Sequence, residues 1–261
     1  ILSVSEEGSA LVFSGAGVAL VTLFDGSGNV DAEATAAHAA RLVELGVSAL
    51  IVAGTTGEPM SLDRGERVAL IEAVRGAADG CPVIAGTGDR TVRQATQLTR
   101  DAIDAGADAV LTLSPPAPVD VSAYYRAVVA EAADTPVLAY HFPAISSPGF
   151  EPDALSGFGV VGVKDSSGDP KRLFATLGSF DGAFYPGSPF LVSLAGANGA
   201  AGTILAVGNV APELAAQAFA GDEDAQRDLA DIALSLTGNR WAAIKAATAE
   251  RFGTATYTRM S

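Results

Sequence analysis

Short apolar segments recur along the chain, and each is followed by a longer stretch in which apolar residues have helical spacing. Eight such segments are spaced evenly, at residues 17–23, 49–53, 82–86, 107–113, 136–140, 160–164, 183–185 and 202–207. They are apolar nearly throughout, which is typical of strands buried on both faces of a sheet. Because parallel neighbours need a crossover connection, this alternation predicts a parallel sheet covered by helices.

The stretches between the strands carry signals for helix ends. Ser61 is the expected N-cap of one helix, with Asp63 in its first turn. Thr91 opens another helix, which we expect to end at Gly106 because glycine readily adopts the left-handed conformation of a helix end. Residues 222–252 predict one or two further helices and no new strand.

Two architectures of the α/β class fit this order, a closed (β/α)₈ barrel and an open doubly wound sheet. The number of strand-like segments and their even spacing favour the barrel, also called a TIM barrel. We therefore expect residues 1–261 to form a single domain, with the barrel at about 15–220 and C-terminal helices at about 221–254. The chain contains no low-complexity tract that would indicate a linker.

Composition narrows the classes of function. The net charge of −14 argues against nucleic acid or an anionic membrane surface as a partner. Cys81 is the only cysteine, which excludes an intrachain disulfide, and two histidines are too few for most zinc or iron sites. No apolar run reaches membrane-spanning length, and residues 1–7 lack the basic region of a signal peptide. We expect a cytoplasmic protein.

In a barrel, function lies where strands end and βα loops begin, and the sixth strand ends with Lys164. Side chains alternate along a strand, so Lys164 should share a face with Gly162 and Val160. If that face looks into the barrel, removal from water favours the neutral amine, which attacks carbonyl carbon. The alternative is a structural lysine that pairs with Asp165 at the strand edge.

Two further loops carry groups that suit such chemistry. After the second strand, Gly54 and Gly57 flank Thr55 and Thr56, and adjacent backbone N–H groups with two hydroxyls can hold a small carboxylate. An ordinary βα turn is the alternative.

Tyr140 ends the fifth strand and can move protons, although a lone tyrosine is more often a core residue. His141, the next residue, should point to the opposite face and be structural.

Together these segments resemble the dihydrodipicolinate synthase/N-acetylneuraminate lyase family of class I aldolases. The resemblance covers roughly residues 15–215 and rests on residues 18–24, Gly-Thr-Thr-Gly-Glu at 54–58, Tyr-His-Phe-Pro at 140–143, Gly-Val-Lys-Asp-Ser-Ser at 162–167, and residues 185–188 and 199–204. It implies a barrel with a C-terminal helical extension, assembled as a dimer or, more usually, a tetramer, that uses no metal or organic cofactor. Pyruvate and an aldehyde are the implied substrates.

The resemblance also implies roles for single residues. Lys164 would form a Schiff base (imine) with the keto acid, Tyr140 would relay protons, and Thr55 would hydrogen-bond Tyr140. Thr56 and nearby backbone N–H groups would hold the carboxylate of the keto acid. The remaining substrate-binding residues implied are Gly54, Gly57, Gly187 and Ile204.

Departures from the family pattern affect the second substrate. Residues 113–118 lack the tyrosine pair of the synthase branch, and Ala144 to Ser147 lack its arginine, although Arg90 could replace it. Residues 188–190 lack the acidic side chains of the sialic-acid branch. Because Ser146 and Ser147 offer only hydroxyls, we expect a 2-keto-3-deoxy-sugar-acid aldolase. The alternatives are 4-hydroxy-tetrahydrodipicolinate (dihydrodipicolinate) synthase, a non-catalytic keto-acid-binding homologue and, last, an open-sheet phosphate- or nucleotide-binding enzyme.

Overall fold

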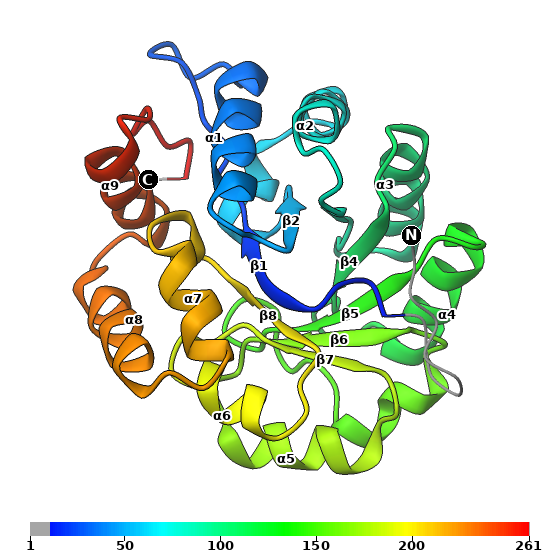
Figure 1. The fold of residues 1–261 in the computed structure, drawn as a ribbon. Helices are drawn as coiled ribbons and strands as arrows, with labels where there is room; N and C mark the ends of the chain where they lie inside the picture. Colours follow the sequence, from blue (N-terminus) through cyan, green and yellow to red (C-terminus); the bar gives the residue numbers. More distant parts are fainter. Residues whose placement is uncertain (1–10, 261) are drawn as a thin grey trace.

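Strands and helices alternate around a central barrel in the computed structural model, which describes residues 11–260 (Figure 1). Neighbouring strands pair in parallel in the order β7-β6-β5-β4-β3-β2-β1-β8. The Ala201 N–H donates to the Phe184 carbonyl at 3.0 Å, which links β7 to β8 and nearly closes the ring. The predicted (β/α)₈ barrel is confirmed. Its strands are β1 (Gly15–Ala19), β2 (Ala49–Val52), β3 (Val83–Gly86), β4 (Ala109–Leu113), β5 (Val137–His141), β6 (Gly162–Asp165), β7 (Ala183–Pro186) and β8 (Gly202–Leu205).

Helices cover the outside of the barrel, and two more follow the last strand and its helix (Figure 1). One crossover departs from the expected alternation, because β5 and β6 are joined through a short 3₁₀ turn (Pro152–Gly157). The helices are α1 (Ala32–Glu44), α2 (Arg64–Ala77), α3 (Val92–Asp104), α4 (Val121–Ala132), α5 (Pro170–Ser179), α6 (Val192–Ala197), α7 (Pro212–Phe219), α8 (Glu223–Ser235) and α9 (Arg240–Phe252). The predicted C-terminal extension corresponds to α8 and α9.

The first strand ends earlier than the apolar pattern predicts. Beyond β1 the Val21 N–H donates to the side chain of Asn209 at 3.1 Å, and the Leu23 N–H donates to the hydroxyl of Thr35 at 3.0 Å. The backbone of residues 20–23 is thus satisfied partly by side chains, which explains why the strand ends although its residues stay apolar.

Helix ends were predicted with mixed success. Ser61 is not the cap of α2, because its hydroxyl donates to the Glu58 carbonyl at 2.9 Å. Asp63 caps the helix instead, in a reciprocal capping box with Glu66. Thr91 caps α3 as predicted, and Gly106 follows the helix with φ of +89°.

The interior of the barrel is closed by aromatic side chains at the end opposite the βα loops. Phe13 stacks on Tyr185 with ring centroids 4.5 Å apart, and the Tyr185 hydroxyl donates to the Phe13 carbonyl at 2.9 Å. Burial raises the pKa of Tyr185 to about 12. A Cβ on Gly17 would lie 2.8 Å from the Phe13 ring, so the glycine makes room for this plug.

No helix within residues 11–260 is both long and apolar enough to cross a membrane. The same part of the chain contains no group of three or more His, Cys, Asp or Glu side chains that could hold a metal ion. The expectation about residues 1–7 lies outside the described residues.

His38 lies on α1, buried against Phe252 of α9 with ring centroids 5.5 Å apart. Burial lowers the pKa of His38 to about 4. The unfolded chain therefore binds a proton at this position at higher pH than the folded protein does. The stability that depends on a neutral His38 is present above pH 6.5 and is lost as the pH falls toward 4.

We predict that His38→Leu weakens the pH dependence of unfolding. Between pH 7 and pH 5 the wild-type protein should lose about 2 kcal/mol of unfolding free energy through this residue. Urea unfolding at both pH values would measure the difference. Equal losses in the two proteins would show that His38 does not titrate in this range.

Candidate active site

A cavity of about 730 Å³ opens where β5, β6 and β7 end and is covered in part by α8 and α9. It brings together five of the residues predicted from the sequence: Thr55, Thr56, Tyr140, Lys164 and Gly187. The other three do not line it. Ile204 lies deeper, in the apolar cluster inside the barrel, and Gly54 lines a smaller neighbouring cavity of about 230 Å³. Gly57 lies behind the threonines, with its carbonyl bonded to Thr22.

Lys164 is the second-to-last residue of β6, lies inside the barrel and is 4% exposed. Its Nζ lies 4.4 Å from the centroid of the Tyr140 ring, so the amine rests on the face of the tyrosine. Gly162 shares the interior face as predicted, and its missing Cβ leaves room for Leu138. Val160 does not, because it precedes the strand and packs in the cluster between barrel and helices.

The alternative ion pair between Lys164 and Asp165 is not formed. Asp165 points to the outer side of the barrel and binds Arg172 of α5 at 2.6 Å. No ion pair within residues 11–260 includes Lys164. The amine is therefore buried without a carboxylate partner in the described structure, beside a hydroxyl and in contact with a cavity. This is the environment in which a lysine can act as a nucleophile.

Ser166 and Gly187 shape the floor of the cavity around this amine. The Ser166 hydroxyl donates to the Tyr140 hydroxyl at 3.4 Å. The expected hydrogen bond between Thr55 and Tyr140 is absent from the described structure, where Ser166 is the hydroxyl donor to Tyr140. A Cβ on Gly187 would lie 2.0 Å from Ser166 Oγ and 3.0 Å from Lys164 Cε. A residue without a side chain is therefore required there.

The threonine loop is a single 3₁₀ turn, Thr55–Gly57, held from two sides. The Thr22 hydroxyl donates to the Gly57 carbonyl at 2.8 Å, and the Trp241 indole N–H donates to the Thr55 carbonyl at 2.9 Å. Both threonines line the cavity. Within residues 11–260 neither threonine hydroxyl has a hydrogen-bond partner, whereas the Gly57 N–H donates to the Gly54 carbonyl at 2.9 Å. The hydroxyls suit the predicted role of the loop in binding a small carboxylate.

His141 points away from the cavity, as the alternation of the strand predicts. Its Nδ1 accepts a hydrogen bond from the Phe150 N–H at 3.3 Å, and its ring packs against the Phe150 ring. Burial, together with the nearby Arg172 guanidinium, lowers the pKa of His141 to about 4. A neutral histidine on the outer side of the strand cannot serve as the proton relay of the cavity.

Sequence reasoning missed the contribution of α9. Arg240 lines the cavity, with its guanidinium carbon 5.5 Å from the centroid of the Phe142 ring. Arg90, the replacement expected from the sequence, is exposed and does not line the cavity. Among the described residues that line it, Arg240 and Lys164 carry the basic groups, and none is Asp or Glu. An acidic protein thus has a pocket whose described lining lacks acidic side chains.

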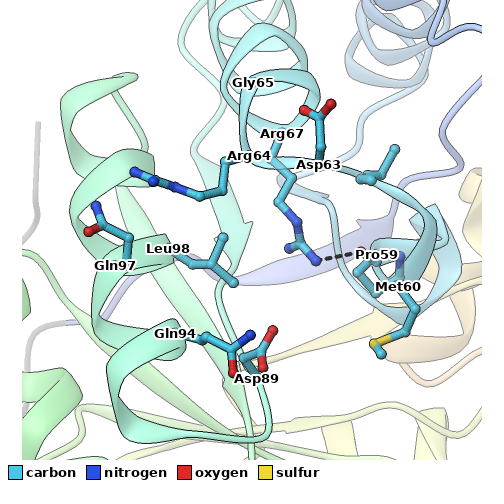
Figure 2. A pocket seen from close by; sticks show the side chains of 11 residues that line it. Pro59, Met60, Asp63, Arg64, Gly65, Arg67, Asp89, Gln94, Gln97 and Leu98 are labelled. Atoms are coloured by element: carbon cyan, nitrogen blue, oxygen red, sulfur yellow. Dashed lines mark hydrogen bonds between the residues drawn. The ribbon is translucent and has the colours of Figure 1, made fainter.

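A second cleft of about 610 Å³ lies between the first turns of α2 and α3 (Figure 2). Arg67 crosses its floor and donates to the carbonyls of Pro59 and Gly86, and burial lowers the pKa of its guanidinium. Lys164 and Tyr140 do not line this cleft. The candidate chemistry therefore belongs to the cavity at the barrel mouth.

Residues 12–237 match the model of the dihydrodipicolinate synthetase family. The chain belongs to this family. A 4-hydroxy-tetrahydrodipicolinate synthase of Natronomonas pharaonis is 36% identical over 169 residues, which are 62% of this chain and 57% of that protein. The enzyme of the same name from Corynebacterium diphtheriae is 34% identical over 206 residues, covering 76% of this chain and 68% of that protein.

Solved structures show the same family fold. The dihydrodipicolinate synthase of Aquifex aeolicus superposes with a TM-score of 0.85 at 27% identity, covering 95% of this chain and 91% of that chain. Dihydrodipicolinate synthetase family members are pyruvate-dependent lyases, so membership of this family supports the predicted class of enzyme, while the Schiff base on Lys164 stays a prediction.

We predict that Gly187→Ala impairs the cavity without unfolding the barrel. The added methyl group must displace Ser166 or Lys164, and a displacement approaching 1 Å costs ~10²-fold in a reaction that depends on alignment. Borohydride trapping of pyruvate on the protein would measure the loss. Gly178→Ala is the matched control, because a Cβ there meets no atom within 4 Å. Wild-type trapping by Gly187→Ala would show that the close contact does not constrain the amine.

Proposed function

We propose that this protein condenses pyruvate with a carboxylate-bearing aldehyde through an imine on Lys164, as a 4-hydroxy-tetrahydrodipicolinate synthase does. The observation that carries the proposal is the buried amine of Lys164, which lies against Tyr140 and within reach of Thr55 and Thr56 in one cavity. A keto-acid-binding protein without catalysis would not need a nucleophile at this position.

The arrangement supports each step of such a reaction. The neutral amine attacks the C2 carbonyl carbon of pyruvate, and loss of water gives the protonated imine. Loss of a proton from C3 then gives an enamine, because the imine nitrogen accepts the electron pair. The enamine carbon attacks the aldehyde carbon, the new alkoxide takes up a proton, and hydrolysis of the imine restores the lysine. Tyr140, beside both Lys164 and Ser166, is the group placed to move these protons.

Arg240 supports a second substrate that carries a carboxylate. Transfer of a carboxylate from water into a pocket is costly unless a cation or several donors receive it. The sequence-based preference for a sugar acid rested on the lack of an arginine after Pro143 and on the serines at 146 and 147. Ser146 is buried and donates to the Ser114 carbonyl at 2.7 Å, so its hydroxyl is not free to bind a sugar.

A 2-keto-3-deoxy-sugar-acid aldolase is the second candidate, and one observation favours it. Ser167 and Ser188 line the cavity and offer hydroxyl donors to a polyhydroxylated aldehyde. The two candidates share the imine chemistry of Lys164 and differ in what the outer part of the cavity binds. The choice of aldehyde therefore separates them.

We predict that pyruvate and borohydride leave a stable adduct on Lys164. Peptide mass spectrometry should find it there and not on Lys171, which lies in the first turn of α5, or on Lys245. Lys164→Ala should abolish the adduct, whereas Lys171→Ala is the control that should retain it. An adduct elsewhere, or none on the folded wild-type protein, would refute the proposed function.

We predict that Arg240→Met lowers kcat/KM for aspartate semialdehyde, an aldehyde that bears a carboxylate, by ~10- to 100-fold, because one charge-assisted contact is lost. The kcat/KM for glyceraldehyde, which has no carboxylate, should stay nearly unchanged. Steady-state rates with each aldehyde would measure both values. Arg90→Met, which removes an arginine outside the cavity, should match the wild type. A wild-type preference for glyceraldehyde would support the sugar-acid alternative instead.

A further inference from the structure

Glu58 follows the threonine loop directly, and its side chain is completely buried. One carboxylate oxygen accepts from Lys245 Nζ of α9 at 2.5 Å. The other accepts from the segment after α9, namely from the Thr258 hydroxyl at 2.7 Å and from the Arg259 and Met260 N–H groups at 2.8 Å each. Both oxygens of this carboxylate thus accept from donors within residues 245–260.

The backbone of Glu58 is held in a conformation that it would not choose alone. Its φ is +56°, in the left-handed region that residues with a side chain seldom adopt. Such a conformation persists only when surrounding contacts impose it. The buried bonds of the carboxylate supply these contacts, so the shape of the loop depends on a part of the chain almost 190 residues away.

One face of α9 holds both ends of the loop. Trp241 and Lys245 are four residues apart and therefore lie on the same side of the helix. Trp241 donates to the carbonyl of Thr55, where the loop begins, and Lys245 binds Glu58, where it ends. Ile244, between them, lines the cavity and packs on Val21 and Leu23 after β1.

Charge gives Lys245 a second role. Glu58 lies two residues after Thr56, so an unpaired negative charge there would oppose binding of a carboxylate at the threonines. Lys245 neutralises it and is itself anchored by donating to the Tyr257 carbonyl at 2.8 Å. Arg259 ties the same segment to α2 by binding Glu66 at 2.6 Å.

We propose that Trp241, Lys245 and Glu58 are positioning residues that set the geometry and charge of the carboxylate-binding loop Thr55–Gly57. The proposal rests on the proposed function for its substrate, the keto-acid carboxylate. It concerns how α9 and residues 254–260 prepare the loop. Trp241 also lines the cavity, whereas Glu58 and Lys245 are not among its lining residues.

The test compares four variants of the full chain. Glu58→Gln removes the charge at nearly constant shape, and Trp241→Phe removes the indole donor but keeps an aromatic ring. Lys245→Met leaves Glu58 buried without its cation, and the double variant Glu58→Gln/Lys245→Met removes both charges. Glu213→Gln is the matched control. It breaks the ion pair between Glu213 of α7 and Arg251 of α9, which does not touch the loop.

Two readouts are taken from each folded variant. The first is the pyruvate concentration that gives half-maximal borohydride trapping on Lys164. The second is backbone hydrogen exchange of a peptide covering residues 54–58, which does not depend on catalysis. We expect Glu58→Gln and Trp241→Phe to raise the half-maximal concentration by ~10-fold, the effect of one lost polar contact, with faster exchange and the same maximal yield.

Lys245→Met should be impaired more than Glu58→Gln, and the double variant should recover part of that loss because no unpaired charge remains. Glu213→Gln should match the wild type in both readouts. The proposal is overturned if Glu58→Gln and Trp241→Phe lower thermal stability but leave trapping and loop exchange unchanged. If Glu58→Gln does not fold, Trp241→Phe alone decides in the same way. Absence of trapping in the wild type would instead refute the proposed function, while loop exchange would still test the positioning role.

Discussion

The parallel register of three neighbouring strands determines where the candidate chemistry can occur. Tyr140 of β5 is paired with Lys164 of β6, and Lys164 with Tyr185 of β7, so these residues share one level of the barrel and one face. A slip of one residue would turn Lys164 outward and bring Asp165 inward. Phe13 and Tyr185 fill the barrel interior, and the missing side chain at Gly187 leaves room for the amine at this level.

The sequence predicted the barrel and five residues of the cavity wall because both depend on local patterns. Alternation within a strand places Lys164 inside and His141 outside, and the glycines and threonines of residues 54–57 identify the loop. Boundaries were less predictable where side chains from distant segments take over backbone hydrogen bonds, as Asn209 does for Val21. Ser61 and Asp63 are both suitable caps, and only the reciprocal contact with Glu66 selects the second.

Contributions of α9 could not be predicted, because they depend on how a helix beyond the last strand docks on the mouth of the barrel. Arg240 follows a capping asparagine and resembles any surface arginine in the sequence. Lys245 is one of three lysines, and no local pattern in the sequence indicates its burial, yet it is at least as deeply buried as Lys164. Burial lowers the pKa of Lys245, and hydrogen bonding to Glu58 opposes that effect. A lysine with a buried carboxylate partner is structural, whereas one without such a partner is free to react.

Because α9 supplies both Arg240 and the contacts of Trp241 and Lys245, the proposed selection of the aldehyde and the proposed support of the keto-acid loop both lie in one helical segment. Arg240 lies at the first turn and is absent from the contacts that hold the loop. Natural variation or directed evolution can therefore change the accepted aldehyde at this one position while the imine-forming machinery stays intact. Exchange of the whole helix between relatives would instead alter both properties together, so chimeric enzymes should take α9 and residues 254–260 from one parent.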